Sequence, residues 1–254
     1  MGKTMYFKTD IRRLVKNYPM YLAILGVAGS LLFSLENNAF EPGMVNENAM
    51  DTCIMAMESS GVMIAYAFCA FAFAPVFCED LEQRYLRYSI GRGNRKKYVV
   101  SKAGVIYLAS AAAMILGMGL FGLYVRFRLP WTVDGVCYLA EGGLYGSLLE
   151  KGWYAAYLFL CALQMGMLAG TLSLLAAFVS LFVTNKMIIL ITPVLAYQVL
   201  LEFRGSGWAN VMIFNPRAQP FSGDAAYFLT VCCFSLLPGA VLTWEIYRQI
   251  KHRL

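Results

Sequence analysis

The chain has 254 residues, of which 59% are hydrophobic and only 14% are charged, with a net charge of +6. A soluble domain of this size cannot bury so much apolar surface, because the buried fraction rises only slowly with chain length. Apolar runs long enough to cross a bilayer recur throughout, so we expect an all-α polytopic membrane protein with a single transmembrane domain over residues 1–254.

Residues 1–18 predict an amphipathic helix that lies along the membrane surface. Apolar residues recur at helical spacing, and basic residues occupy another face of the same helix, which would place the apolar stripe in lipid and the bases near headgroups. The two sets are Phe7, Ile11, Leu14 and Tyr18, and Lys8, Arg12 and Lys16. The alternative is a solvated basic leader.

Six segments qualify as membrane spans, namely 20–35, 61–78, 103–125, 153–183, 187–201 and 227–244. The first, second and fifth are short for a hydrocarbon core of about 30 Å. The fourth is too long, so we expect it to project beyond the membrane or to bend near Gly166 and Gly170. These glycines form a G-x-x-x-G pattern, which is typical of close helix packing or of a dimer contact.

The distribution of basic residues predicts that both termini lie in the cytoplasm, because cytoplasmic loops carry an excess of Lys and Arg. With this orientation, 16 of the 21 Lys and Arg residues are inside, and the first outer loop, 36–60, holds five acids and no base. The net charge is then that of a cytoplasmic face beside anionic lipid, and it requires no nucleic-acid partner.

Two features of the predicted outer loops remain open. Cys53 and Cys137 lie in different outer loops, so a disulfide between them is possible, although spacing alone cannot specify the pairing. Residues 205–226 contain Pro216 and Pro220, which prevent one continuous helix. Either a short re-entrant helix or a plain amphiphilic loop fits this segment.

Several classes of catalytic site are excluded by residue content. The only histidine is His252, in the tail, which argues against Ser–His hydrolysis and His-ligated metal sites within the membrane. The predicted spans contain no aspartate, and the chain has no G-x-x-x-x-G-K-[ST] loop for ATP. We therefore expect no catalytic residues and no bound metal or cofactor.

The stretch after the second span, CEDLEQRYLRYSIGRGNRKKYVVSK (78–102), concentrates charge between two uncharged segments. Acids and then bases continue the helix beyond the membrane, G-R-G-N at 91–94 interrupts it, and the helix restarts at Arg95. This predicts a helix–turn–helix hairpin over 79–102; the alternative is an ordinary loop whose bases only fix orientation. Its charged residues are Glu79, Asp80, Glu82, Arg84, Arg87, Arg92, Arg95, Lys96, Lys97 and Lys102.

The order of these residues resembles the ABC type-2 exporter permease family, the membrane subunits of many bacterial ATP-binding-cassette exporters. In that family the second span ends in Glu-x-Gly-Thr-Leu, followed by Pro-x-Ser-Arg and by a lysine seven positions after the arginine. Here the segment 82–86 takes the first place, Arg95 is the arginine and Lys102 is the lysine. The glycine, threonine, proline and serine of the pattern are replaced by Arg84, Tyr85, Arg92 and Asn94.

The resemblance implies a permease subunit in a bacterial inner membrane that moves an apolar or amphipathic substrate, such as an antimicrobial peptide, a drug or a lipid-like molecule, out of the cell. Two permeases, either two copies or a copy and a sister chain, would each sit on an ABC ATPase subunit that binds ATP and magnesium. The hairpin would be the coupling element between permease and ATPase.

In that family the second and fifth spans line the substrate cavity, which here implies Met63, Tyr66, Phe68, Phe71, Phe73, Phe77, Tyr197 and Gln198. The alternative role for these side chains is contact with lipid or with neighbouring helices. For the whole chain, the alternative function is a membrane scaffold or sensor that docks a cytoplasmic partner on the basic hairpin without transport.

Overall fold

The computed structural model describes residues 10–12, 14, 18–38, 48–78, 95–132, 137, 139, 143–183, 185–203, 213–215 and 223–252. Within these residues the structure contains helices and no strand. The helices are α2 (Tyr18–Asn38), α3 (Ala49–Glu58), α4 (Gly61–Phe71), α7 (Arg95–Arg128), α8 (Gly146–Glu150), α9 (Tyr154–Val179), α10 (Lys186–Glu202) and α12 (Asp224–His252).

Five segments of the described chain are long and apolar enough to cross a membrane: α2, α7, α9, α12 and the stretch Gly61–Cys78 that begins with α4. The predicted fifth span falls on α10, which has 17 residues. At 1.5 Å per residue α10 is about 26 Å long, somewhat less than a hydrocarbon core of about 30 Å. The structure is therefore that of a multi-pass α-helical membrane protein with five candidate spans and one shorter apolar helix.

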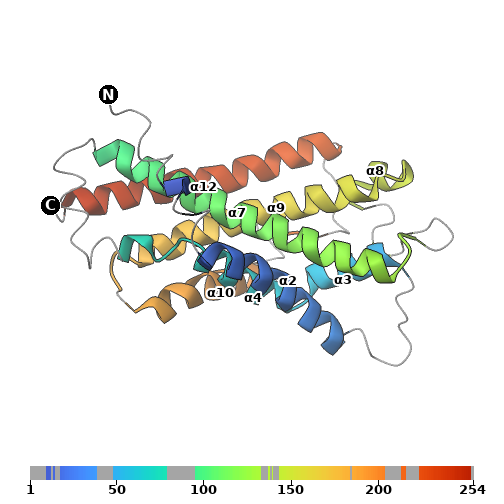
Figure 1. The fold of residues 1–254 in the computed structure, drawn as a ribbon. Helices are drawn as coiled ribbons and strands as arrows, with labels where there is room; N and C mark the ends of the chain where they lie inside the picture. Colours follow the sequence, from blue (N-terminus) through green and yellow to red (C-terminus); the bar gives the residue numbers. More distant parts are fainter. Residues whose placement is uncertain are drawn as a thin grey trace.

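The long helices lie side by side and form an elongated bundle (Figure 1). Helix α9 is central: it packs most extensively against α7 and also contacts α4, α10 and α12, while α2 packs against α4 and α7. One end of the bundle carries the start of α7, the start of α10 and the end of α12, and we call it the basal end. The opposite end carries α3 and α8, and we call it the cap end.

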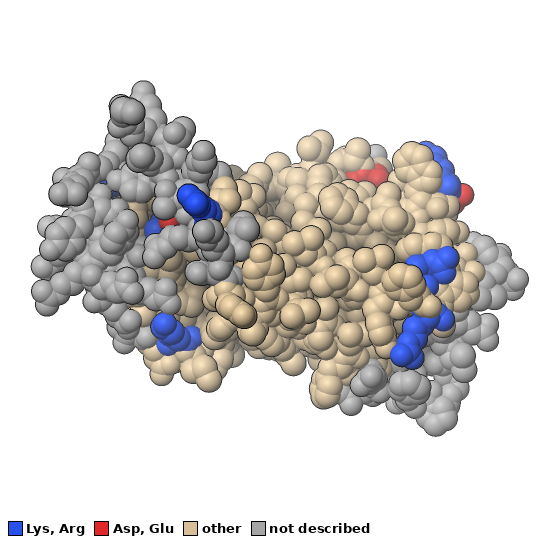
Figure 2. Space-filling view, in the orientation of Figure 1, with Lys and Arg blue, Asp and Glu red and all other residues tan. Residues whose placement is uncertain are grey.

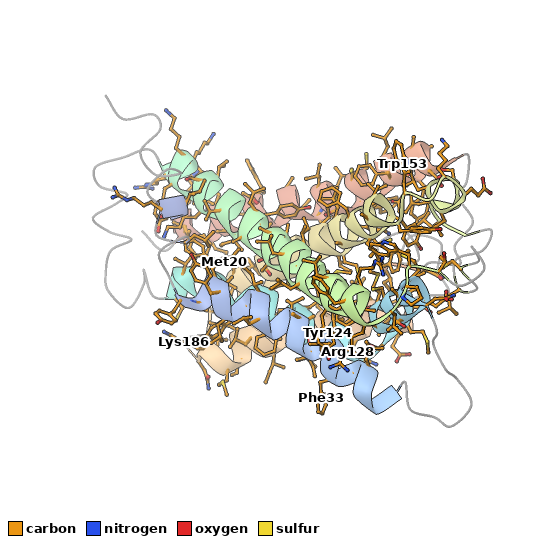
Figure 3. All side chains as sticks on the ribbon, turned by 45° about the vertical axis from the view of Figure 1, so that its right-hand side comes forward. Met20, Phe33, Tyr124, Arg128, Trp153 and Lys186 are labelled. Carbon is orange, nitrogen blue, oxygen red and sulfur yellow. The ribbon has the colours of Figure 1, made fainter. Side chains whose placement is uncertain are left out.

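Charged side chains gather at the two ends of the bundle and leave an uncharged band between them (Figure 2). Large apolar side chains are exposed on this band; Leu25, Leu195 and Leu237 are 65%, 61% and 66% exposed. Phe33 points away from the bundle in the same manner (Figure 3). Such a belt is unfavourable in water and is what a lipid-facing surface requires.

The predicted second span is not one continuous helix. Helix α4 ends at Phe71, and turns at 72–75 lead to a short helical stretch at 76–78. Pro75 explains the break, because it has no N–H to bond the carbonyl of Phe71, four residues earlier, and its ring would clash with that carbonyl. The turn is held instead by bonds from Phe73 N and Ala74 N to Ala70 O, at 3.3 and 2.9 Å.

Helix α9 runs without interruption through Gly166 and Gly170 and ends at Val179. A Cβ at Gly166 would lie 3.1 Å from the carbonyl oxygen of Ala111, and one at Gly170 would lie 2.6 Å from the ring of Tyr107. Both glycines therefore let α9 approach α7 within the same chain.

The predicted outer loop 36–60 contains helix α3, which the sequence analysis missed. Its first residues bond to the segment after α7, from Ala49 N to Pro130 O at 2.8 Å and from Met50 N to Trp131 O at 3.2 Å. Asp51, an acid assigned to a solvated loop, is buried. Its carboxylate accepts bonds from Leu139 N at 3.0 Å and Cys137 Sγ at 3.2 Å. Helix α3 thus packs across the end of α7, beside α2 and α4.

Candidate functional site

The tip of the predicted coupling hairpin lies outside the described residues, and its second arm lies inside them. Glu79, Asp80, Glu82, Arg84, Arg87 and Arg92 belong to the part that the structure does not describe. Arg95, Lys96 and Lys97 form the exposed first turn of α7. Arg95 begins α7 at the basal end, and Cys78 packs in a buried cluster with Ala176 of α9 and Ile189 of α10.

The helices on either side of the hairpin are fixed by a buried apolar cluster, which we call the basal cluster. It joins the segment after α4 to the start of α7 and to the ends of α9 and α12. Its buried members are Phe73, Val76, Phe77, Tyr98, Val99, Ala103, Val105, Ile106, Ala109, Leu174, Ala177, Leu181, Ile246 and Ile250. The start of α7 is therefore packed tightly against α9 and α12, because apolar cores are close-packed.

Lys102, which the sequence analysis placed on the charged hairpin, is buried inside this cluster and is only 2% exposed. Its ammonium lies 3.9 Å from the carboxylate of Asp10, in the segment before α2. The same ammonium lies 5.8 Å and 5.5 Å from the ring centroids of Phe73 and Tyr98, over the ring faces. The basal end thus contains a buried ion pair with aromatic walls.

This ion pair connects the segment before α2 to the arm of the hairpin. A charge withdrawn from water is costly unless an opposite charge and oriented π faces replace its hydration. The sequence carried a signal for this arrangement: Tyr98, Val99, Lys102 and Ile106 recur at helical spacing, which places the lysine on the apolar face of α7. The number of charged residues in 78–102 suggested that Lys102 is exposed, although its helical spacing places it on the apolar face.

Within one chain, several of the residues predicted to line a substrate cavity are packed between helices. Tyr66 of α4 and Tyr197 of α10 are buried, and their ring centroids lie 4.7 Å apart. Phe73 and Phe77 belong to the basal cluster. Phe68 packs its ring against Gly26 of α2.

The remaining members of that predicted set also lie apart from any common cavity. Met63 is half-buried against the main core, Phe71 is half-buried, and Gln198 is exposed. Helices α4 and α10 pack against each other within the chain, with Tyr66 on Tyr197.

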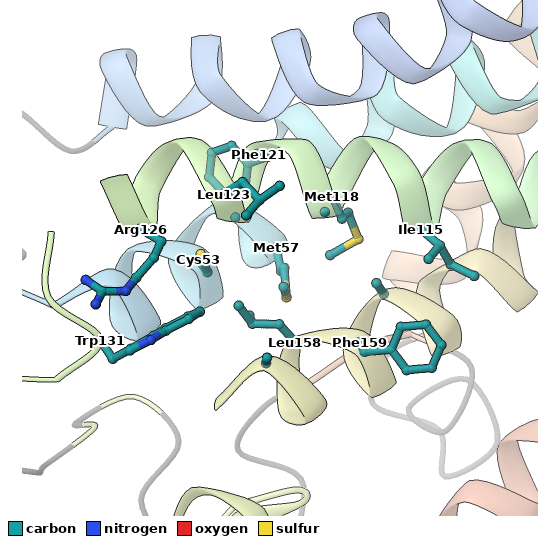
Figure 4. Close-up of a pocket in the computed structure, with 14 residues that line it drawn as sticks. Cys53, Met57, Ile115, Met118, Phe121, Leu123, Arg126, Trp131, Leu158 and Phe159 are labelled. Atoms are coloured by element: carbon teal, nitrogen blue, oxygen red, sulfur yellow. The ribbon is translucent and has the colours of Figure 1, made fainter. Parts of the chain in front are cut away.

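Two of the cavities on the described surface are lined by none of that predicted set. One, of about 320 Å³, lies at the basal end between α7 and α12, where Lys96 stands 5.9 Å from the ring centroid of Tyr247. The other, of about 250 Å³, lies at the cap end between α3, α7 and α9 (Figure 4). We call the second one the cap groove.

The cap end contains free cysteines and is held together by polar contacts between segments. Cys53 and Cys137, both described, do not form the disulfide that the sequence allowed. Burial raises the pKa of the Cys53 thiol to about 12. Asp224, at the start of α12, accepts bonds from Tyr145 N at 3.1 Å and Ser147 Oγ at 2.7 Å, which join α12 to the start of α8.

No protein family, curated protein or solved structure matches this chain. Among the described residues, no cluster of His, Cys, Asp and Glu could hold a metal ion. The described arrangement offers a tightly packed basal end and a belt of exposed apolar side chains.

Proposed function

We propose that the chain is the permease subunit of an ATP-driven exporter and that it pairs with a second permease, either a copy of itself or a sister chain. Each permease would sit on an ABC ATPase subunit that binds ATP and magnesium. The basal end would face the cytoplasm of a bacterium, with both termini there, and α10 would complete six spans. The substrate class that fits the apolar bundle is a hydrophobic or amphipathic molecule.

The observation that carries this proposal is the connection between the hairpin and the bundle. In this proposal the hairpin would leave and re-enter the bundle at the basal end, where the basal cluster packs the start of α7, its expected second arm, against α9 and α12. A partner that pushes on a solvated hairpin needs such a rigid base in order to move helices. An ordinary topogenic loop has no need of a buried lysine in its arm, and Lys102 is buried.

The close packing of Tyr66 on Tyr197 favours the second candidate function, a scaffold or sensor without a transport path, because it leaves the predicted substrate route filled within one chain. In an exporter, the route would instead lie between two permeases. The two functions differ in their dependence on ATP: an exporter stimulates hydrolysis by its partner, and a scaffold need not do so.

The test is a charge reversal at the start of α7, Arg95→Glu together with Lys96→Glu. Both side chains are exposed, and acidic residues at a helix N-terminus are favourable, so membrane insertion and folding should be retained. We expect the variant to lose transport while its partner still hydrolyses ATP.

The matched control is Lys186→Glu, because Lys186 is also an exposed first residue of a helix at the basal end. It lies outside the hairpin and should leave coupling intact. Normal coupling in the Arg95→Glu, Lys96→Glu variant would contradict the assignment of the hairpin. An equal loss of transport in the Lys186→Glu control would show that any charge reversal at the basal end has this effect.

A further inference from the structure

The cap groove has an apolar floor and one charged residue at its mouth. Cys53 and Met57 of α3 and Met118 and Phe121 of α7 form the floor, and each is at most 5% exposed. Among the fourteen described residues that line it, the single charged side chain is Arg126. Arg126 and Trp131 stand at one end of the groove, and Ile115 and Phe159 stand at the other (Figure 4).

The length of the groove matches one leaflet of a bilayer. Along α7 its lining runs from Ile115 to Arg126, eleven residues apart. At 1.5 Å per residue this is about 16 Å, or about half of a hydrocarbon core of about 30 Å. The depth is therefore that of one extended acyl chain that enters from the membrane interface. A volume of about 250 Å³ lies just below the range of drug-sized sites, which suits a single chain better than a ring system.

The groove opens sideways, toward lipid. Leu123 and Phe159, which flank it, are 58% and 54% exposed, and both lie on membrane-spanning helices. Gly119 keeps the opening clear, because a Cβ at this position would meet nothing within 4 Å. An acyl chain can thus enter from the bilayer without passing through water.

Arg126 supplies the charge that selects a headgroup. It follows directly after the apolar stretch of α7, at the depth where headgroups begin, and it is exposed. One of its guanidinium nitrogens donates to Leu129 O at 3.0 Å, and the guanidinium lies 5.2 Å from the Trp131 ring centroid. A guanidinium has five N–H donors in a planar fork that fits phosphate oxygens, so these contacts orient it and leave donors for a ligand.

We propose that the cap groove is a binding site for an anionic phospholipid, with one acyl chain lying between α3, α7 and α9 and with the phosphate at Arg126. This assignment depends on the chain being embedded in a membrane and does not depend on the proposed export function. In the topology proposed above, the lipid belongs to the outer leaflet.

Photolabelling of the full-length chain in vesicles tests the proposal. The purified chain is reconstituted in phosphatidylcholine vesicles with a trace of phosphatidylglycerol that carries a diazirine on one acyl chain, and the labelled peptides are mapped by mass spectrometry. We expect the label to concentrate on 115–123 of α7 and 155–162 of α9, above the level on the exposed face of α12. A phosphatidylcholine probe with the same diazirine measures the labelling that does not depend on an anionic headgroup.

Two pairs of variants separate the acyl chain from the headgroup. Gly119→Leu fills the groove and should lower its labelling to the level of α12, whereas Gly29→Leu, at a glycine of α2 that is equally open, should not. Arg126→Gln should lower the ratio of phosphatidylglycerol to phosphatidylcholine labelling about fivefold, the effect of one basic residue at an anionic headgroup. Arg128→Gln removes the same charge outside the groove and should leave that ratio unchanged.

Either half of the proposal can fail separately. Labelling that is even over all exposed helices, or that persists in Gly119→Leu, would overturn the acyl-chain site and leave only annular lipid. Equal labelling by the two probes, or equal effects of Arg126→Gln and Arg128→Gln, would overturn the headgroup assignment. A groove that neither probe labels would overturn the lipid site altogether.

Discussion

Replacing Lys102 by methionine removes the buried charge at the basal end while keeping the length of the side chain. Asp10 then loses a charged neighbour at 3.9 Å, and the rings of Phe73 and Tyr98 lose a cation that lies over them. Breaking a buried ion pair by removing one partner costs about 3–5 kcal/mol. Because this pair is at the long limit of an ion-pair distance, we expect about 3 kcal/mol of lost stability.

The assay is unfolding of the detergent-purified chain by added sodium dodecyl sulfate, followed by circular dichroism. Lys97→Met is the matched control, because Lys97 is an exposed lysine on the same helix and should change the free energy of unfolding by less than about 0.5 kcal/mol. A double-mutant cycle with Asp10→Asn should give a coupling of about 1–3 kcal/mol. Equal effects of Lys102→Met and Lys97→Met, or a coupling near zero, would refute the basal ion pair.

Three further predictions use other contacts. Gly170→Leu should destabilise the bundle by about 1–3 kcal/mol, because its Cβ would lie 2.6 Å from the Tyr107 ring. The same change at Gly29, where a Cβ would meet nothing within 4 Å, should be close to neutral. Equal unfolding midpoints of the two variants would contradict the packing of α9 on α7. Cys53, with its pKa raised to about 12, should have less than about one thiol in ten thousand ionised at pH 7.5 and should resist maleimide; rapid labelling of the folded chain would show that the thiol is not buried. Asp51→Ala should weaken the cap by about 1–3 kcal/mol and speed proteolysis there, because it leaves buried donors unsatisfied; unchanged digestion would argue against those bonds.

Hydropathy was sufficient to locate the long helices but not to determine which face of each helix is buried. Continuous apolar runs predicted helices close to the observed α2, α7, α9 and α12. The faces of these helices could not be assigned, because in lipid the exposed face is as apolar as the buried one. The cavity-lining role of Tyr66 and Tyr197 came from the family resemblance, and within one chain these two rings pack against each other.

The other differences have local causes that the sequence contains. Pro75 ends α4 at Phe71, although the segment remains apolar through Cys78. Helix α3 was hidden because its acids suggested a solvated loop, whereas Asp51 is satisfied by bonds from a segment more than eighty residues away. Such long-range pairing cannot be read from local pattern. Lys102 could have been predicted as buried from the helical spacing of its apolar neighbours.

The most direct test of the proposed function is purification of the tagged chain in a gentle detergent from the membranes of its native host, with identification of every protein that accompanies it. The proposal predicts a partner with a Walker ATPase domain in equal amount, and loss of coupled transport when Arg95 and Lys96 are reversed. A chain that purifies alone under these conditions would contradict the proposal and would favour the scaffold function.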